Sequence, residues 1–396
     1  MSDQVADPDA DASSQQAWGR SGWVTAAMPS ALAGWVAARL LVGGAAILAD
    51  VLGPHPGTEP PANVLLAWDG AFYRVLAEHG YGGAPHEATR FFPLYPLLGR
   101  WLGDLLGGRT DLALLVIANG LALVAAVVLW RLVRLLGGDE RLATGSVLVF
   151  SLFPASAALV FAYSESLAVV LSLWAGIALA RRRPLWAAVP LLLAGLTRPT
   201  GVLLCVPVAL LLVRELRTVR ADGPGGGPMP IGGRRGWVAW STAVVAPLLG
   251  LVVFVAWLQV AHGNGSAPFE IQRQLRDGFV DPVSRTVRML VDVGTGHFRD
   301  VYNLGLTAAL VVAAVGAVRS RLSAAWTSYL VVGLLVSLSG NVVDSIGRYG
   351  VALAPAWAFG LAFLARDRRV MAVLLATSSL GMLGLTTMWI RGYVIP

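Results

Sequence analysis

The chain has 396 residues, of which 56% are hydrophobic and only 13% are charged, and its mean hydropathy is +0.67. Soluble domains carry about 25% charged residues, so this composition excludes a soluble globular protein. The formal net charge of +7 is carried by arginine, because the chain contains no lysine, and many arginines lie at the ends of apolar runs. That placement is typical of membrane topology and not of a surface that binds nucleic acid, which is excluded as a partner.

The apolar runs predict membrane-spanning helices. Several of them approach or exceed the roughly 20 residues that cross a bilayer as a helix. Because backbone amides in lipid must be hydrogen-bonded internally, runs this rich in Ala, Leu and Val favour helices over barrel strands. The sequence therefore predicts an all-α polytopic membrane protein, a bundle of about eleven transmembrane helices near residues 30–52, 111–136, 142–162, 164–180, 185–197, 199–213, 237–261, 301–318, 322–340, 350–365 and 370–390.

Two stretches outside these spans are polar or rich in glycine. Residues 1–28 are rich in aspartate and predict a disordered cytoplasmic tail, which leaves 29–396 as one transmembrane domain. The stretch "RELRTVRADGPGGGPMPIGGRR" makes up nearly all of 214–236 and predicts a flexible Gly/Pro-rich loop there. It lacks the G-x-x-x-x-G-K-[ST] pattern, so it is not a phosphate-binding loop.

The arginines also predict the orientation in the membrane. With a cytoplasmic N-terminus, the short linkers "RLVRLLGGDER", "RRR", "RSR" and "RDRR" and the loop 214–236 all fall on the cytoplasmic side. The C-terminus then lies outside, together with two long loops, 53–110 and 262–300. Long loops carry function more often than they merely connect helices, so we expect the functional site on this outer side.

The first outer loop combines charge with aromatic residues. From Trp68 to His79 the apolar residues recur at helical spacing and form one stripe, with Asp69, Arg74 and Glu78 on the opposite face. The segment "RFFPLYPLLGRWL" adds a second aromatic and apolar piece. Such segments lie at membrane surfaces, so the loop is expected to form interfacial helices.

The charged residues of the outer half allow two interpretations each. Asp69 could cap its helix or act as a catalytic carboxylate. Glu165 in "FAYSESLA" could simply begin a span as part of an outside turn, or it could have a functional role. Arg198 and Arg348 could have no role beyond reaching water from helix ends, or they could bind a ligand. The histidines show no metal-binding spacing, so the sequence predicts no metal site.

Four motifs resemble one known family. "WDGAFYRVLAEHGY" followed by "RFFPLYPLL", then "FPASAALVFAYSESLAV", "LTRPTG" and "RYGVALAP", are similar in type and order to segments of the phosphatidylinositol-glycan class V mannosyltransferases, which include GPI mannosyltransferase 2 and bacterial relatives. The similarity runs from about Leu66 to Pro355. One position departs from it, because relatives often carry histidine near the position of Phe72.

The resemblance implies a GT-C type glycosyltransferase of the bacterial plasma membrane, multi-pass within the lipid bilayer. Such an enzyme takes a sugar, here mannose, from a polyprenyl-phosphate donor without cofactor or metal, and passes it to a lipid, glycan or protein acceptor. Asp69 in the first outer loop would be the general base. The donor-binding residues expected are Trp68, Tyr81, Arg90, Tyr95, Tyr163, Glu165, Arg198 and Arg348.

Two other functions stay open. A transporter or flippase for lipid-linked sugars would also be a bundle with polar residues inside, although its key residues should lie near the midplane in broken helices. A non-catalytic envelope scaffold would tolerate the loss of the Asp69 carboxylate.

Overall fold

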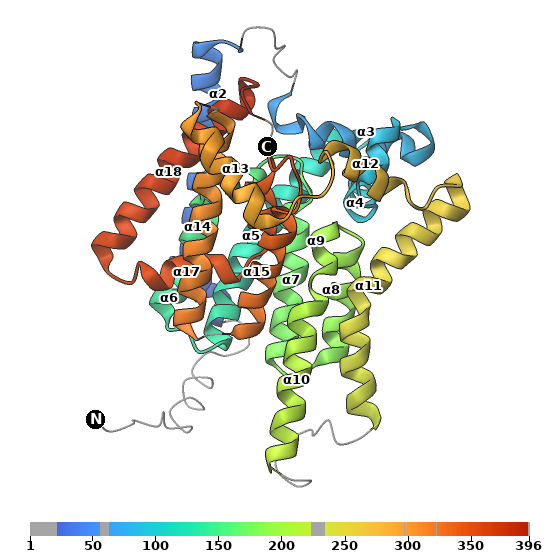
Figure 1. Cartoon of the computed structure of the whole chain (residues 1–396), viewed down its shortest axis with the longest axis vertical. Coiled ribbons are helices and arrows are strands. Elements are labelled where there is room, and N and C mark those ends of the chain that lie inside the picture. Colours follow the sequence, from blue (N-terminus) through green and yellow to red (C-terminus); the bar gives the residue numbers. More distant parts are fainter. Residues whose placement is uncertain (1–21, 56–62, 223–233, 297, 322, 395–396) are drawn as a thin grey trace.

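The computed structural model describes residues 22–55, 63–222, 234–296, 298–321 and 323–394, and these residues fold almost entirely into helices (Figure 1). An isolated antiparallel bridge joins Phe279 to Gly340. The predicted all-α fold is thus confirmed. The helices are α2 (Gly22–Leu52), η1 (Val64–Leu66), α3 (Asp69–Gly83), η2 (His86–Arg90), α4 (Leu94–Leu105), α5 (Thr110–Leu135), α6 (Glu140–Leu152), η3 (Pro154–Leu159), α7 (Glu165–Ala180), α8 (Pro184–Gly195), α9 (Pro199–Val202), α10 (Cys205–Asp222), α11 (Arg234–His262), α12 (Ala267–Leu275), α13 (Pro282–Gly294), α14 (Phe298–Ser320), α15 (Ala324–Ser337), α16 (Ile346–Ala352), α17 (Ala356–Leu364) and α18 (Arg368–Ile390).

Within the described residues, six helices are long and apolar enough to cross a membrane: Gly22–Leu52, Thr110–Leu135, Pro199–Arg217, Arg235–His262, Asp300–Ser320 and Arg368–Ile390. Three shorter apolar helices, α7, α8 and α15, lie among them. The chain is therefore a multi-pass membrane protein.

The eleven predicted spans were not all continuous helices. The span expected at 142–162 is wrong, because α6 ends at Leu152 and the 3-10 helix η3 follows. The span expected at 350–365 is likewise divided into α16 and α17. Pro154 and Pro355 stand at these breaks, where a proline has no amide hydrogen to continue a helix.

The first helix also begins earlier than expected. α2 starts at Gly22, so residues 22–28 are helical and do not belong to a disordered tail. The remainder of the expected tail, 1–21, lies outside the described residues, as do residues 223–233 of the expected loop 214–236. The two ends of that expected loop are helical, because α10 runs to Asp222 and α11 begins at Arg234.

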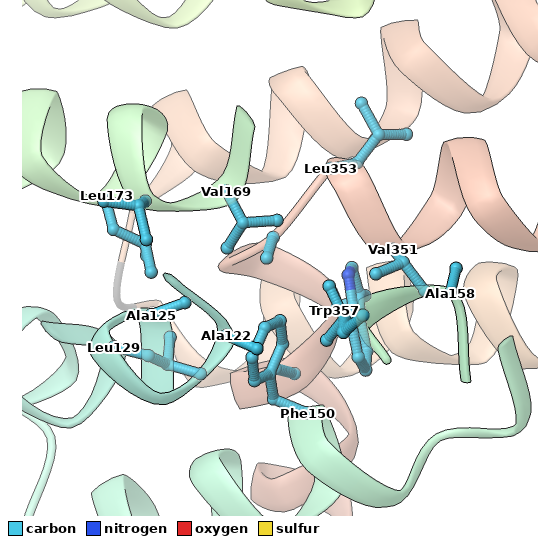
Figure 2. Close-up of a cluster of buried hydrophobic side chains, with 14 of the residues drawn as sticks. Ala122, Ala125, Leu129, Phe150, Ala158, Val169, Leu173, Val351, Leu353 and Trp357 are labelled. Atoms are coloured by element: carbon cyan, nitrogen blue, oxygen red, sulfur yellow. The ribbon is translucent and has the colours of Figure 1, made fainter. Parts of the chain in front are cut away.

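The core is built from α5, α6, α7 and the α16–α17 pair (Figure 2). Trp357 of α17 is fully buried, and its ring lies 4.8 Å from that of Phe153 and 6.0 Å from that of Phe150. Buried alanines of α5 let α6 and α7 approach it closely, as small residues do in membrane bundles. This packing fixes α7 and α16, which both carry residues of the site described below.

Glycines mark the closest helix crossings. A Cβ atom on Gly316 of α14 would lie 2.1 Å from the carbonyl oxygen of Gly360 of α17. A Cβ on Gly195 of α8 would meet the carbonyl oxygen of Pro247 of α11 at the same distance. Only glycine permits backbones this close, so both helix pairs depend on it.

The short helices of the two long loops gather at one end of the bundle (Figure 1). The 63–105 segment forms η1, α3, η2 and α4, and α12 of the later loop packs on η2. The predicted stripe on α3 is partly confirmed, because Leu76 is buried and Arg74 and Glu78 are exposed. The buried face also includes Gly70, Tyr73 and Ala77, because α3 packs on α4 and α5.

Candidate functional site

A charged pocket of about 230 Å³ lies where the two loops meet the helix bundle. It combines the start of α3, the break between α8 and α9, the end of α12 and the segment from α15 to α16. Four guanidinium groups and two carboxylates line it. The lining residues are Asp69, Tyr73, Arg90, Phe91, Phe92, Thr197, Arg198, Pro199, Gln272, Leu275, Arg276, Ser337, Val342, Val343, Asp344, Ser345, Arg348 and Tyr349.

Asp69 is the first residue of α3, but it does not cap the helix. Trp68 occupies the N-cap position, with φ of 52° and no side-chain cap hydrogen bond. The Asp69 carboxylate instead accepts a hydrogen bond from Nη1 of Arg348, and Nη2 of Arg90 lies 3.8 Å from its other oxygen. The carboxylate is therefore held by two arginines that face the pocket, and the capping interpretation is wrong.

Beneath the pocket, Glu165 joins two arginines. Its side chain is completely buried at the first turn of α7, and Oε1 lies 2.6 Å from Nη1 of Arg198 and 3.7 Å from Nε of Arg348. The contact with Arg198 is an ion pair and not an aligned hydrogen bond. A buried carboxylate costs several kcal/mol unless it is paired, so these arginines are required partners. Glu165 does not lie in an exposed turn.

Arg198 and Arg348 do not snorkel to water, because they are 6% and 5% exposed. Arg198 stands at the break after α8, where Pro199 begins the next helical turn, and also donates to Oγ of Ser164 at 3.2 Å. Arg348 lies within α16 and donates to Oγ of Ser345 at 3.2 Å. Two buried cations thus come from segments far apart in the sequence, and both border the pocket.

Tyr349 is surrounded by arginines. The guanidinium of Arg276 lies 4.9 Å from its ring centre, and that of Arg198 lies 5.6 Å away. Burial opposes ionisation of the hydroxyl, but the charges of Arg276, Arg348 and Arg198 outweigh burial and lower the pKa of Tyr349. This wall of the pocket is strongly positive and suits an anionic ligand.

Tyr73 also lines the pocket and supplies a neutral hydroxyl. Its OH lies 2.6 Å from Oγ of Ser164, and burial raises its pKa despite the nearby charge of Arg198. Tyr73 therefore stays protonated and donates or accepts hydrogen bonds in the pocket lining.

Four of the predicted aromatic residues do not line the pocket. Tyr163 lies directly behind it, with the Arg348 guanidinium 5.0 Å from its ring. Trp68 packs near Phe161 at 6.4 Å. Tyr81 and Tyr95 donate to backbone carbonyls of Phe91 and Leu114. The structure thus brings together Asp69, Arg90, Glu165, Arg198 and Arg348 and leaves the aromatic residues around them.

Sequence reasoning missed Arg276, Gln272, Tyr73 and Tyr349. Arg276 follows α12 in the second long loop, 262–300, and donates to the carbonyl of Ser337 at 3.3 Å. A signal was present for Tyr349, which stands beside Arg348 in the quoted motif "RYGVALAP". No signal joined Arg276 to the first loop, because only packing of α12 on η2 brings them together.

Among the residues that the structure describes, no group of three or more His, Cys, Asp or Glu side chains is placed to hold a metal ion. Together, the fold and the pocket define a multi-pass helical membrane protein with a cationic pocket at one end of its bundle.

No family model and no curated protein matches the chain. Among solved structures, it is similar to the Archaeoglobus fulgidus oligosaccharyltransferase, crystallised with Zn and sulfate, at 15% sequence identity and a TM-score of 0.43. The match covers 91% of this chain but 52% of that one, so the chain spans about half the length of that protein.

Proposed function

We propose that the protein is a membrane glycosyltransferase that takes a sugar from a polyprenyl-phosphate donor. The resemblance of its motifs to the mannosyltransferases suggests that this sugar is mannose. The acceptor would be a hydroxyl of a lipid, glycan or protein on the outer side of the membrane. The observation that carries the proposal is the pairing of the Asp69 carboxylate with two arginines in a pocket lined by four. A glycosyl-phosphate donor needs both chemistries, a base for the acceptor and fixed cations for the phosphate.

In the proposed reaction the acceptor oxygen attacks the anomeric carbon while Asp69 takes its proton. The new C–O bond forms as the bond from carbon to phosphate oxygen breaks, and the electron pair leaves with the phosphate. A displacement in one step inverts the anomeric carbon. Arg348 and Arg90 would meet the charge that develops on the phosphate, and Arg276 and Arg198 would complete the cradle.

The ion pairs of Asp69 suggest how donor binding prepares the base. In the structure its carboxylate is held by Arg348 and Arg90. A bound phosphate would compete for the same guanidinium groups and weaken their hold on Asp69. The carboxylate would then be free to accept the acceptor's proton. Glu165 would keep Arg348 charged and in place during this exchange.

An apolar groove beside the pocket supports a lipid-linked donor. The groove has a volume of about 650 Å³ and lies between α13, α14 and α15. Ser337 lines the pocket and its neighbour Leu338 lines the groove, so both cavities reach the end of α15. A prenyl chain in the groove would place its phosphate at the pocket.

Membranes with and without the protein, incubated with labelled polyprenyl-phosphate-mannose, test the proposal. Label should pass to an acceptor only when the protein is present, and equally well with a chelator. Label that crosses a sealed vesicle without a new covalent product would instead favour the transporter. Arg198 lies at a helix break, as transporter sites often do. Transport of the lipid-linked sugar is therefore the second candidate function.

The groove has its own test. The test variant is Leu335→Trp, because Leu335 lines the groove and is 48% exposed. The matched control is Leu249→Trp, because Leu249 of α11 is 45% exposed and lies outside the groove. Leu335→Trp should raise the KM for the lipid donor roughly tenfold, equivalent to about 1.4 kcal/mol of binding. Leu249→Trp should leave KM unchanged. Equal KM values for both variants would remove the groove from the proposal.

A further inference from the structure

A second polar cavity lies at the opposite end of the bundle from the candidate site. Its volume is about 460 Å³. α15 connects the two sites, because Trp326 near its start lines this cavity and Ser337 at its end lines the first. At 1.5 Å per helical residue they are roughly 16 Å apart. The lining residues are Leu135, Leu136, Gly176, Leu179, Ala180, Arg182, Leu211, Arg214, Glu215, Arg321, Ser323 and Trp326.

Three arginines from three separate elements converge on this cavity. Arg182 belongs to the turn between α7 and α8, Arg214 to α10, and Arg321 to the turn between α14 and α15. Glu215 pairs with Arg182 at 3.6 Å. In the described part of the chain, Arg214 and Arg321 form no ion pair with a carboxylate. The cavity therefore presents excess positive charge, and its walls between the arginines are apolar.

The backbone at two of these arginines is in the left-handed region. φ is 53° at Arg182 and 56° at Arg321, each directly after a helix end, where glycine is the favoured residue. The other described non-glycine residues with positive φ are Trp68 and Asp277, which are neighbours of the pocket residues Asp69 and Arg276. Strained backbone tends to cluster at functional sites. Here it accompanies both charged cavities.

We propose that this second cavity binds a phosphate-bearing anion, the headgroup of an anionic phospholipid in the leaflet on that side. Arginine forks match phosphate oxygens, and basic pockets between transmembrane helices recognise such headgroups. The apolar walls of Leu179, Leu211 and Trp326 suit the glycerol and the first acyl carbons. Both arginine-bearing turns belong to the "RRR" and "RSR" linkers for which the sequence predicts a cytoplasmic location. The bound lipid would fasten α10 to the two turns.

The test uses the purified full-length protein in phosphatidylcholine nanodiscs with and without phosphatidylglycerol, and counts retained lipids by native mass spectrometry. The variant is Arg214→Gln with Arg321→Gly. Glycine suits the positive φ at 321, so the melting temperature should not fall on that account. Arg141→Gln, an exposed arginine at the start of α6, is the control. None of these residues belongs to the first pocket, so the result does not depend on sugar transfer.

Wild type and the Arg141→Gln control should retain phosphatidylglycerol, whereas the double variant should lose roughly tenfold or more in affinity. Equal retention of phosphatidylcholine, or unchanged retention by the double variant, would overturn the proposal. A separate titration with inorganic phosphate distinguishes the source of the anion. Binding of free phosphate without retention of phosphatidylglycerol would refute the lipid headgroup and leave a soluble phosphate compound as ligand.

Discussion

Replacing Asp69 by asparagine separates the chemistry of its carboxylate from its structural role. Asparagine keeps the shape and one oxygen that accepts hydrogen bonds, but it cannot take the acceptor's proton. Loss of a general base lowers the rate by about 10²–10⁴-fold, and sugar transfer should fall by that amount. The variant should still be inserted into the membrane.

The structure also sets the expected change in stability. Two unit charges about 4 Å apart attract by roughly 4 kcal/mol at an effective dielectric constant of about 20, and desolvation offsets much of this. Arg348 retains Glu165, whose Oε1 lies 3.7 Å from its Nε, so it is not left unpaired. The free energy of unfolding should therefore fall by only about 1–3 kcal/mol. A helix cap would have predicted no change at all, because asparagine caps as well as aspartate.

The assay is transfer of labelled sugar from the polyprenyl-phosphate donor, with the thermal midpoint measured on the same preparations. Glu78→Gln is the matched control, because Glu78 lies on the same helix and forms only long, exposed contacts, at 4.0 Å with Arg74 and 3.8 Å with His79. Its stability should change by less than about 0.5 kcal/mol and its activity hardly at all. Transfer by Asp69→Asn within about threefold of wild type would refute the general base. Glu165 would then be the next carboxylate to test.

Two further predictions concern packing and topology. Gly316→Ala should lower the free energy of unfolding by about 1–3 kcal/mol, because its methyl group would meet the α17 backbone. Gly305→Ala on the same helix, where a methyl group would have nothing within 4 Å, should not lower it. Equal thermal midpoints for the two variants would show that α14 and α17 are less closely packed. Reporters fused after Gly83 and after Gly226 should lie on opposite sides of the membrane, and finding both on one side would overturn the predicted orientation.

The hydropathy of the sequence was sufficient to determine the class of this protein. Bilayer thickness and the need to hydrogen-bond every amide leave few structures open to long apolar runs, so helices and their approximate positions follow directly. The same reasoning predicted single helices across Pro154 and Pro355, where the structure has breaks. Proline divides an apolar run there without making it less hydrophobic overall. Asp69, Glu165, Arg198 and Arg348 stood out because charge is rare in so apolar a chain.

Only the tertiary structure decided which of these charges meet. Spacing along one helix predicts neighbours on that helix, but the ion pairs of Asp69 with Arg348 and of Glu165 with Arg198 join separate helices. Their distances depend on how α3, α7 and α16 pack. Arg276 entered the site for the same reason, through the contact of α12 with η2. The sequence thus specified the charged groups, and helix packing determined their partners, because electrostatic interactions depend on distance in space and not on separation along the chain.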